Sequence, residues 1–237
     1  MMNERTSPFL IGLTGMYCSG KNRVAALLEK QGFPVLDVDK LGHRAIETQR
    51  EAILASFGKA VLGSEGNIDR RKLGEKVFGK AAELAALEAI VHPEANRLTE
   101  EWIKAQTGEF CVINAALLHR SSVFERLDAL ILVKAPLLSR FLRARRRDKL
   151  SWGELFRRFR SQKGFLSPYF KKSMAAVPKS GILELPQGSI LKADIYIVDN
   201  RGYWARSSQK KLEYRIEKIA AALRGGRSFN SFRRGDY

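Results

Sequence analysis

The chain has 237 residues, of which 45% are apolar, so it can bury the core of one or two domains. Its formal net charge is +17, which favours anionic partners. Two cysteines, Cys18 and Cys111, exclude a disulfide framework and indicate a reducing compartment. No apolar run approaches the ~18 residues of a membrane span, and the first residues lack the apolar core of a signal peptide, so we expect a soluble cytoplasmic protein without a membrane partner.

The first 39 residues predict a strand, a loop, a helix and a second strand. Residues 9–13 form a short apolar run that is typical of a buried parallel strand. A glycine-rich loop follows, and residues 22–31 then carry apolar side chains at helical spacing until Gly32 ends the helix. Residues 33–38 predict the second buried strand, with Asp37 and Asp39 at its carboxyl end. This order opens a parallel α/β sheet.

The next block, residues 40–107, is predicted to be mostly helical. One helix should end at Gly58, and a second should stop at Pro93 after a turn around residues 63–74. A third helix should run on to Gly108. A helical block of this length between strands indicates an insertion that could cover a substrate.

The remaining chain predicts three more strands and two helical regions. The strands are expected within residues 110–118, 128–136 and 193–202, and the closing helix within 209–226. Residues 137–162 predict a basic helical region, and 164–190 an irregular excursion. Between Arg140 and Lys172 there are twelve Lys or Arg against two acids, Asp148 and Glu154. This cluster indicates an element that faces phosphate, although a solvated basic helix face is the alternative.

The loop "GLTGMYCSGKN" resembles the phosphate-binding pattern G-x-x-x-x-G-K-S/T, with Gly15, Gly20 and Lys21 in place. Glycines let backbone amides turn toward phosphate oxygens, and the following helix adds the partial positive charge of its N-terminus. The lysine supplies a full positive charge. We interpret Cys18 as a spacer, since no acid or histidine is evidently paired with it.

The last position of the pattern holds Asn22 instead of Ser or Thr, whose hydroxyl normally contacts Mg²⁺. An amide oxygen is also a hard ligand, so Asn22 could contact the metal. It could instead cap the helix while water completes the metal's coordination, or the loop could have lost its chemistry. The sequence leaves these three alternatives open.

Taken in order, the motifs resemble the dephospho-coenzyme A kinase family across roughly residues 9–223. They are "IGLTG" with "SGK", "VLDVDKLGH", "FGKAVLGSEGNIDRRKLGEKVF", "LEAIVHP", "RRRDKLSWGELFRRFRSQ" and "ADIYIVDNRG". The phosphate loop alone marks a very large superfamily, whereas the middle block is much more specific. The resemblance implies phosphoryl transfer from ATP, with Mg²⁺, to the ribose 3′-hydroxyl of dephospho-coenzyme A, the last step of coenzyme A synthesis.

The implied fold is α/β: a three-layer parallel-sheet P-loop kinase core with a helical substrate-binding insertion and a basic lid. The core would comprise residues 1–39, 108–139 and 191–223, and the helical domain 40–107. The lid with its excursion would span 140–190, and a basic, disordered tail 224–237.

The resemblance also assigns roles to individual residues. Asp39 would be the general base, with a helix N-cap as the alternative; Arg143, Arg147 and Arg158 belong to the lid. His43 could equally be an exposed helix histidine, and Arg70 and His92 could be structural. The implied catalytic residues are Lys21, Asp39, Arg143 and Arg147. The implied ATP-binding residues are Gly15, Cys18, Ser19, Gly20, Lys21, Asn22, Arg23, Arg147, Asn200 and Gly202. The implied substrate-binding residues are Asp39, His43, Arg70, His92, Asn114 and Arg158.

The chain departs from the family pattern on the metal side of the site. Besides Asn22, the third strand reads "NAALLHR" where the family often has D-x-P-L-L-x-E, so Asn114 replaces an acid that could hold Mg²⁺ through water. Two rival functions remain: another nucleoside or nucleotide kinase, and a catalytically degenerate P-loop protein that binds nucleic acid or a regulator. No zinc spacing or RNA-recognition motif supports nucleic-acid binding, which we do not expect.

Overall fold

A computed structural model describes residues 7–148, 150–162, 165, 169, 181–183, 193–201 and 206–225. The chain divides into two compact units: one contains the residues up to Val35 and from Gly108 onward, and the other contains Leu36–Thr107. We call them the core unit and the helical unit. No described helix is long and apolar enough to cross a membrane.

The core unit is built on a sheet whose strand order is β2-β3-β1-β4-β6-β5. Strand β1 (Phe9–Gly15) pairs in parallel with β3 (Phe110–Asn114) and with β4 (Ala129–Lys134). Strand β4 also pairs in parallel with β6 (Asp194–Asp199). Strand β2 (Val35–Asp37), at which the two units join, lies next to β3. These strands confirm the predicted parallel α/β fold.

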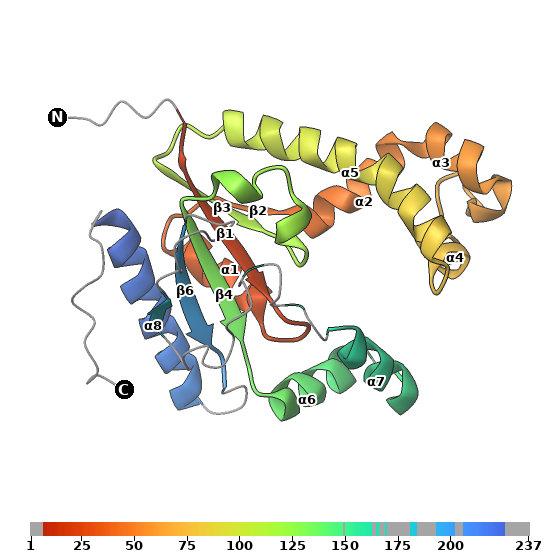
Figure 1. Ribbon diagram of the computed structural model, residues 1–237. Helices are drawn as coiled ribbons and strands as arrows, with labels where there is room; N and C mark the ends of the chain where they lie inside the picture. The colour runs from red at the N-terminus through yellow and green to blue at the C-terminus, as the bar shows by residue number, and fades with distance from the viewer. Residues whose placement is uncertain are drawn as a thin grey trace. The chain divides into compact units, whose positions relative to one another are not determined.

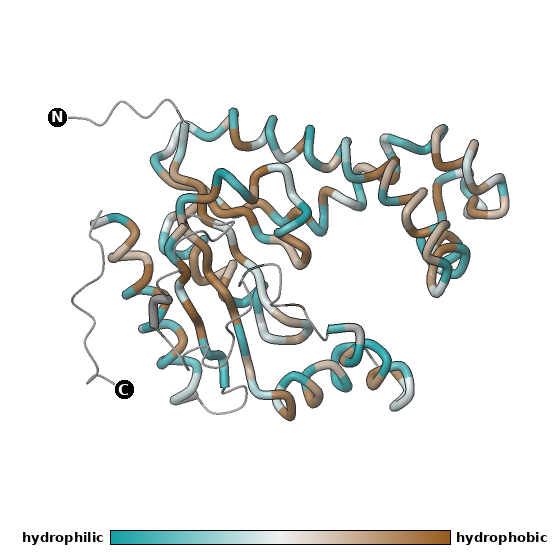
Figure 2. Tube along the Cα trace, viewed as in Figure 1, coloured by the Kyte–Doolittle hydropathy of each residue, from teal (hydrophilic) through white to brown (hydrophobic). Residues whose placement is uncertain are grey.

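Helices α1 (Lys21–Lys30) and α8 (Arg206–Arg224) pack on one face of this sheet (Figure 1). The strands are apolar along most of their length, and α8 alternates apolar and polar residues, as a helix with one buried face should (Figure 2). The resulting core includes the fully buried side chains of Ile11, Leu13, Leu28 and Ile131.

The opposite face of the sheet is covered by the segment after β3, which contains the short 3₁₀ helices η2 (Leu118–Arg120) and η3 (Phe124–Arg126). A side chain at Gly12 would come within 2.6 Å of the Leu118 side chain, so a larger residue would force the buried leucines here to shift. The buried ring of Tyr169, from the excursion, packs against Phe124 at 5.7 Å between ring centroids. At least this part of the excursion therefore helps to cover the sheet.

The basic region after β4 forms two helices, α6 (Leu137–Asp148) and α7 (Trp152–Ser161), which we call the lid helices. The sequence predicted a basic helical region here without locating a break in it. The structure separates the two at Ser151, which caps α7: its hydroxyl accepts from the backbone N–H of Glu154, while the Glu154 carboxylate accepts from the Ser151 N–H.

The helical unit contains α2 (Val38–Thr48), α3 (Arg50–Phe57), η1 (Lys59–Val61), α4 (Arg70–Val77) and α5 (Ala81–Lys104). Its own core gathers Ile53, Phe57, Leu73 and Val77 with neighbouring apolar residues. Asp69 caps the N-terminus of α4: its carboxylate accepts from the backbone N–H groups of Arg71 and Lys72 at 2.9 and 3.2 Å.

Three expectations about the elements were wrong. Helix α5 continues through Pro93, because apolar residues before the proline, including Leu87, Ile90 and Val91, pack on the core of the helical unit, and this packing outweighs the lost backbone hydrogen bond. The helix predicted to end at Gly58 is two helices, which meet at Gln49. Strand β5 (Gly181–Leu183), within the predicted excursion, adds an antiparallel edge to the sheet beside β6.

Candidate active site

The phosphate loop lies between β1 and α1, as the sequence predicted. Its backbone turns sharply: Cys18 has φ 58°, the only positive value at a non-glycine position in the described part of the chain, and Gly20 has φ 94°. The Ser19 N–H donates to the Met16 carbonyl at 2.9 Å, which closes the turn. Lys21 and Asn22 are the first residues of α1, and Arg23, which follows them, is half-buried.

Two glycines of the loop are required by their neighbours. A side chain at Gly15 would come within 2.6 Å of both the Ser19 hydroxyl and the Val133 carbonyl. A side chain at Gly20 would meet the Asn200 amide nitrogen at 2.2 Å, and the positive φ of Gly20 already disfavours other residues. The loop is therefore fitted tightly between β4 and the segment after β6.

Side chains from distant parts of the core unit donate to the carbonyl oxygens of the loop. Arg143 donates to the Ser19 carbonyl at 2.9 Å and to the Asn200 carbonyl at 2.8 Å. The Asn200 amide also donates to the Ser19 carbonyl at 2.8 Å. Arg140 donates to the Tyr17 carbonyl at 2.8 Å. The C=O and N–H of one planar peptide group point in opposite directions. A hydrogen bond that fixes a carbonyl of the loop therefore also fixes the direction of the N–H in the same peptide group.

This network shows what the sequence could and could not indicate. Arg143 and Asn200 were predicted to bind ATP or act in catalysis, and the structure buries both against the loop backbone, with 7% and 5% of their surface exposed. Arg140 was not among the predicted site residues, although it is the first residue of the basic cluster between residues 140 and 172. Gly202 lies outside the described residues.

The exposed side of the lid helices carries the other predicted arginines. Arg147 and Arg158 are each about half exposed, and both approach Asp148: Arg147 Nε donates to it at 2.6 Å, and Arg158 Nη1 lies 3.8 Å away. The hydrogen bond from Arg147 lowers the pKa of the Asp148 carboxyl, which therefore stays ionised near neutral pH. Neither Asp148 nor Tyr17, which donates its hydroxyl to Asp148, was singled out from the sequence.

The electrostatics of the loop cysteine do not favour a nucleophile. Burial raises the pKa of the Cys18 thiol above its usual range, and the nearby positive charge of Arg147 only partly opposes this effect. A thiol with a raised pKa carries little thiolate near neutral pH, so its reactivity is low. The interpretation of Cys18 as a spacer agrees with this environment.

The two asparagines that the sequence analysis relates to a metal, Asn22 and Asn114, lie together. Asn114 ends β3 and is 1% exposed, and its amide nitrogen lies 3.5 Å from the Asn22 amide oxygen. The Asn114 amide oxygen has no hydrogen-bond partner among the described residues. Buried polar atoms are nearly always satisfied, so an unpartnered oxygen at this position fits a ligand or an ion. No described group of three or more His, Cys, Asp or Glu side chains could hold a metal by itself.

In the helical unit, Asp39 and His43 are one turn apart on α2, and both are exposed. Asp37, and not Asp39, occupies the N-cap position of α2, so the alternative role considered for Asp39 was wrong. Asp39 lies in the first turn, where the helix dipole favours a negative charge. His92 is half-buried in α5.

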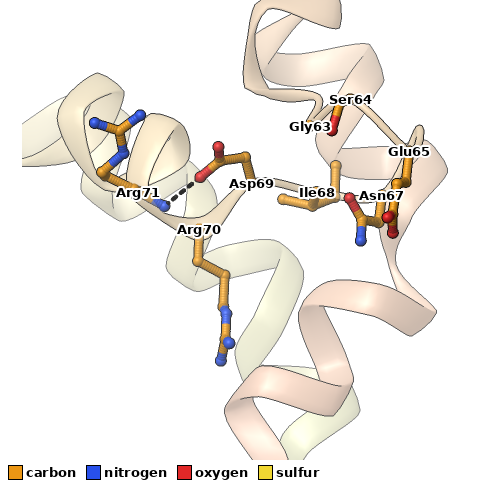
Figure 3. Close-up of a pocket in the computed structure, with 8 residues that line it drawn as sticks. All are labelled: Gly63, Ser64, Glu65, Asn67, Ile68, Asp69, Arg70 and Arg71. Carbon is orange, nitrogen blue, oxygen red and sulfur yellow. Dashed lines mark hydrogen bonds between the residues drawn. The ribbon is translucent and has the colours of Figure 1, made fainter.

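The helical unit also contains a hollow that was not anticipated, lined by the loop before α4 and the first residues of that helix (Figure 3). Arg70 and Arg71 both line it, and their side chains point in different directions (Figure 3). Arg50 holds the loop from the side, donating to the Gly66 carbonyl at 2.9 and 3.0 Å. Arg70 thus stands at a concave, polar surface, which is compatible with contact to an anionic substrate.

A parallel α/β sheet with a phosphate loop after its central strand, followed later by two basic helices, defines a P-loop nucleotide-binding protein of the kinase type. A model of the dephospho-CoA kinase family matches residues 9–166. A dephospho-CoA kinase of Thermus thermophilus is 34% identical over 226 residues, which cover 95% of this chain and 97% of that relative. The chain belongs to the dephospho-CoA kinase family.

Other relatives agree with this assignment. The dephospho-CoA kinase of Bacillus licheniformis is 36% identical over 183 residues, covering 74% of this chain and 90% of its own. A crystal structure from Thermus thermophilus has a TM-score of 0.70 at 34% identity and covers 92% of this chain and 98% of its own. The dephospho-CoA kinase of Campylobacter jejuni, with a TM-score of 0.57, 21% identity and coverage of 91% and 97%, supports the fold alone.

Proposed function

We propose that this protein transfers the terminal phosphoryl group of ATP to the ribose 3′-hydroxyl of dephospho-coenzyme A. The observation that carries the proposal is the phosphate loop, held in a turned conformation by Arg143 and Asn200, in a chain that belongs to the dephospho-CoA kinase family. A prearranged loop of this kind can bind phosphate oxygens without first ordering itself.

Within this proposal, Lys21 and the N-terminus of α1 bind the phosphates, and Gly15, Ser19 and Gly20 shape the loop. Arg143 and Asn200 support the loop from behind, because their polar atoms donate to its carbonyls. Arg147 and Arg158, which are half exposed, are better placed to contact phosphate oxygens with their planar guanidinium groups.

Asp39 is our candidate for the general base. It is exposed and lies in the first turn of α2, two residues after the end of β2, and ligands of parallel α/β sheets bind beyond the carboxyl ends of the strands. A carboxylate can accept the hydroxyl proton as the alcohol attacks phosphorus. His43, one turn later, and Arg70, at the hollow, are our candidates for substrate contacts.

The residues present fit a magnesium ion, because both amide oxygens of the Asn22 and Asn114 pair are hard neutral ligands and that of Asn114 lacks a protein partner among the described residues. These residues would hold Mg²⁺ directly or through water. The ion would neutralise charge on the phosphates of ATP during transfer. Since neither ligand is charged, we expect the nucleotide to bring most of the negative charge that binds the metal.

The test is an ADP-release assay with ATP, Mg²⁺ and a panel of acceptors: dephospho-coenzyme A, adenosine, nucleoside monophosphates and pantetheine. Turnover with dephospho-coenzyme A, but with none of the other acceptors, supports the proposal. Turnover with a nucleoside or nucleotide instead would identify another small-molecule kinase. Binding of ATP without any turnover, with RNA binding that falls steeply with salt, would indicate the degenerate binding protein.

One variant, compared with the wild type, tests the proposed position of Mg²⁺. Asn114→Asp adds one carboxylate beside Asn22. We expect this variant to need severalfold less Mg²⁺ than wild type for ATP affinity to reach half of its maximum. The readout is calorimetric titration of ATP at fixed Mg²⁺ concentrations, which does not depend on turnover. An Asn114→Asp protein with the metal dependence of the wild type would contradict this placement of the ion.

A further inference from the structure

One side chain of the phosphate loop, that of Tyr17, reaches both lid helices. Its hydroxyl donates to the Asp148 carboxylate, and its backbone N–H donates to the Gln162 side-chain oxygen at 3.0 Å. Its ring meets the Phe159 ring edge-on, at 5.5 Å between centroids. Tyr17 therefore bonds to the last residue of α6 and to the residue that follows α7.

The same tyrosine lies under the two arginines that the lid offers to the site. The guanidinium of Arg147 is 5.4 Å from the Tyr17 ring centroid, and that of Arg158 is 5.9 Å from it. Both distances fall within the range in which an aromatic face attracts a cation. Two positive groups thus share one ring, which lies on the phosphate loop itself.

Asp148 completes the arrangement. It accepts from Arg147 Nε at 2.6 Å and from Arg147 Nη2 at 3.0 Å, and it faces Arg158 at 3.8 Å. Its side chain is only 16% exposed, and it is one of two acids in the basic cluster of twelve Lys and Arg between residues 140 and 172. A carboxylate in this position counters the repulsion between the two arginines and fixes the plane of the Arg147 guanidinium.

We propose that Tyr17 and Asp148 are positioning residues that hold the guanidinium groups of Arg147 and Arg158 beside the phosphate loop, ready for the phosphoryl group in transfer. The proposal rests on the function proposed above, because the arginines matter through the phosphate they meet. Tyr17 supplies the ring face and fixes Asp148 with its hydroxyl, and Asp148 orients the arginines. An arginine held in place before ATP binds loses less freedom in the transition state than a mobile one.

The decisive variants are Tyr17→Phe, which keeps the ring and removes the hydroxyl, and Asp148→Asn. We expect each to lower kcat about tenfold and to weaken ATP binding about threefold, as the loss of one hydrogen bond to a charged group would. The KM for dephospho-coenzyme A should stay within about twofold of wild type, because the change acts through the arginines. Tyr214→Phe on α8 and Asp194→Asn at the start of β6 are the matched controls, since both are exposed.

Coupling separates positioning from simple support of the fold. The double variant Tyr17→Phe, Asp148→Asn should lose no more activity than the more affected single variant, because the two residues act as one unit. Likewise, Tyr17→Phe added to a variant with both Arg147→Ala and Arg158→Ala should cost less than about twofold, since both groups that it positions are already gone. A merely structural tyrosine would show additive losses and a lower melting temperature in every background.

The outcomes distinguish this proposal from the proposed function. If wild type phosphorylates dephospho-coenzyme A but Tyr17→Phe matches it in kcat, or the losses are additive, the positioning role is wrong. If wild type lacks this activity, the proposed function fails, and ATP affinity still tests the positioning role of Tyr17. In that case a Tyr17→Phe protein that binds ATP as tightly as wild type in calorimetry overturns the positioning role, and weaker binding supports it.

Discussion

The phosphate loop and the start of α2 carry the two halves of the proposed chemistry, and they are built differently. The loop is held by side chains more than a hundred residues away, including Arg140, Arg143 and Asn200. Asp39 and His43, by contrast, stand exposed on one face of a single helix whose buried side holds Leu41 and Ala45. The first region is arranged by long-range contacts and the second by local helix geometry.

The two regions should therefore respond differently to mutation. Changes around the loop should alter ATP binding even when they touch no phosphate, because the loop's shape depends on its supports. Changes at Asp39 or His43 should alter turnover or acceptor binding while ATP affinity and stability hold, because these side chains are exposed. Four predictions test this contrast.

The largest effect is expected for Asp39→Asn, which removes the proposed base but keeps the shape of the side chain. General-base catalysis contributes about 10²–10⁴ in rate, so kcat should fall by that order while the Kd for ATP stays near wild type. ADP-release kinetics and calorimetry measure the two quantities. Glu47→Gln, exposed later on α2, is the matched control. A drop in kcat of less than threefold would remove Asp39 from the mechanism.

Lys21→Ala should lower kcat by about 10²–10³ and weaken ATP binding as well, because its charge contacts the phosphates before and during transfer. Lys30→Ala at the other end of α1, where the lysine is exposed, should change neither. Calorimetric titration with ATP provides the measurement. Equal affinities for the two variants would contradict a phosphate-binding role for the loop.

Two glycine variants separate the effect of disturbing the loop's support from the effect of backbone strain. Gly20→Ala and Gly79→Ala place a side chain at φ 94° and φ 77°, but only the first meets a neighbour, Asn200 at 2.2 Å, whereas the second has open space. Strain of about 1–2 kcal/mol is common to both. We expect Gly20→Ala to lose ATP affinity at least tenfold beyond any effect of Gly79→Ala, measured on folded protein by calorimetry.

Equal ATP affinity of the two glycine variants would show that Asn200 gives way easily and that the loop is less constrained than its contacts indicate. A thermal melt of each protein separates loss of folding from loss of binding. Both variants should keep the sheet, because neither glycine lies in the central strands.

The smallest effect concerns pH. The pKa of Asp148 is lowered in the folded protein, chiefly by the hydrogen bond from Arg147, so its contribution to stability is present above the unfolded pKa of about 4 and is lost as pH falls through the lower folded value. The free energy of unfolding of wild type should therefore exceed that of Asp148→Asn by a constant amount, about 0.5–1 kcal/mol, between pH 5 and 8. Denaturant unfolding at several pH values measures this difference, and a gap that widens below pH 4 would contradict the sign.

Much of the fold followed from local patterns in the sequence. Apolar runs and the glycine-rich loop predicted the parallel strands and the first helix, since buried strands and phosphate turns have strong local requirements. Pro93 was misleading because a proline's cost is local, whereas the packing of α5 on its neighbours is not visible in one segment. The antiparallel β5 was missed because three residues carry too weak a pattern.

The kind of site can be read from the chain alone: the order of glycines, Lys21 and Asp39 specifies a phosphate loop and an acid after the next strand. The folded chain was needed to find that Arg143 and Asn200 support the loop, that Asn22 and Asn114 are neighbours, and that Tyr17 contacts Asp148. The reason is physical. A backbone turn depends on residues next to one another, whereas a side-chain contact depends on where distant segments meet after folding.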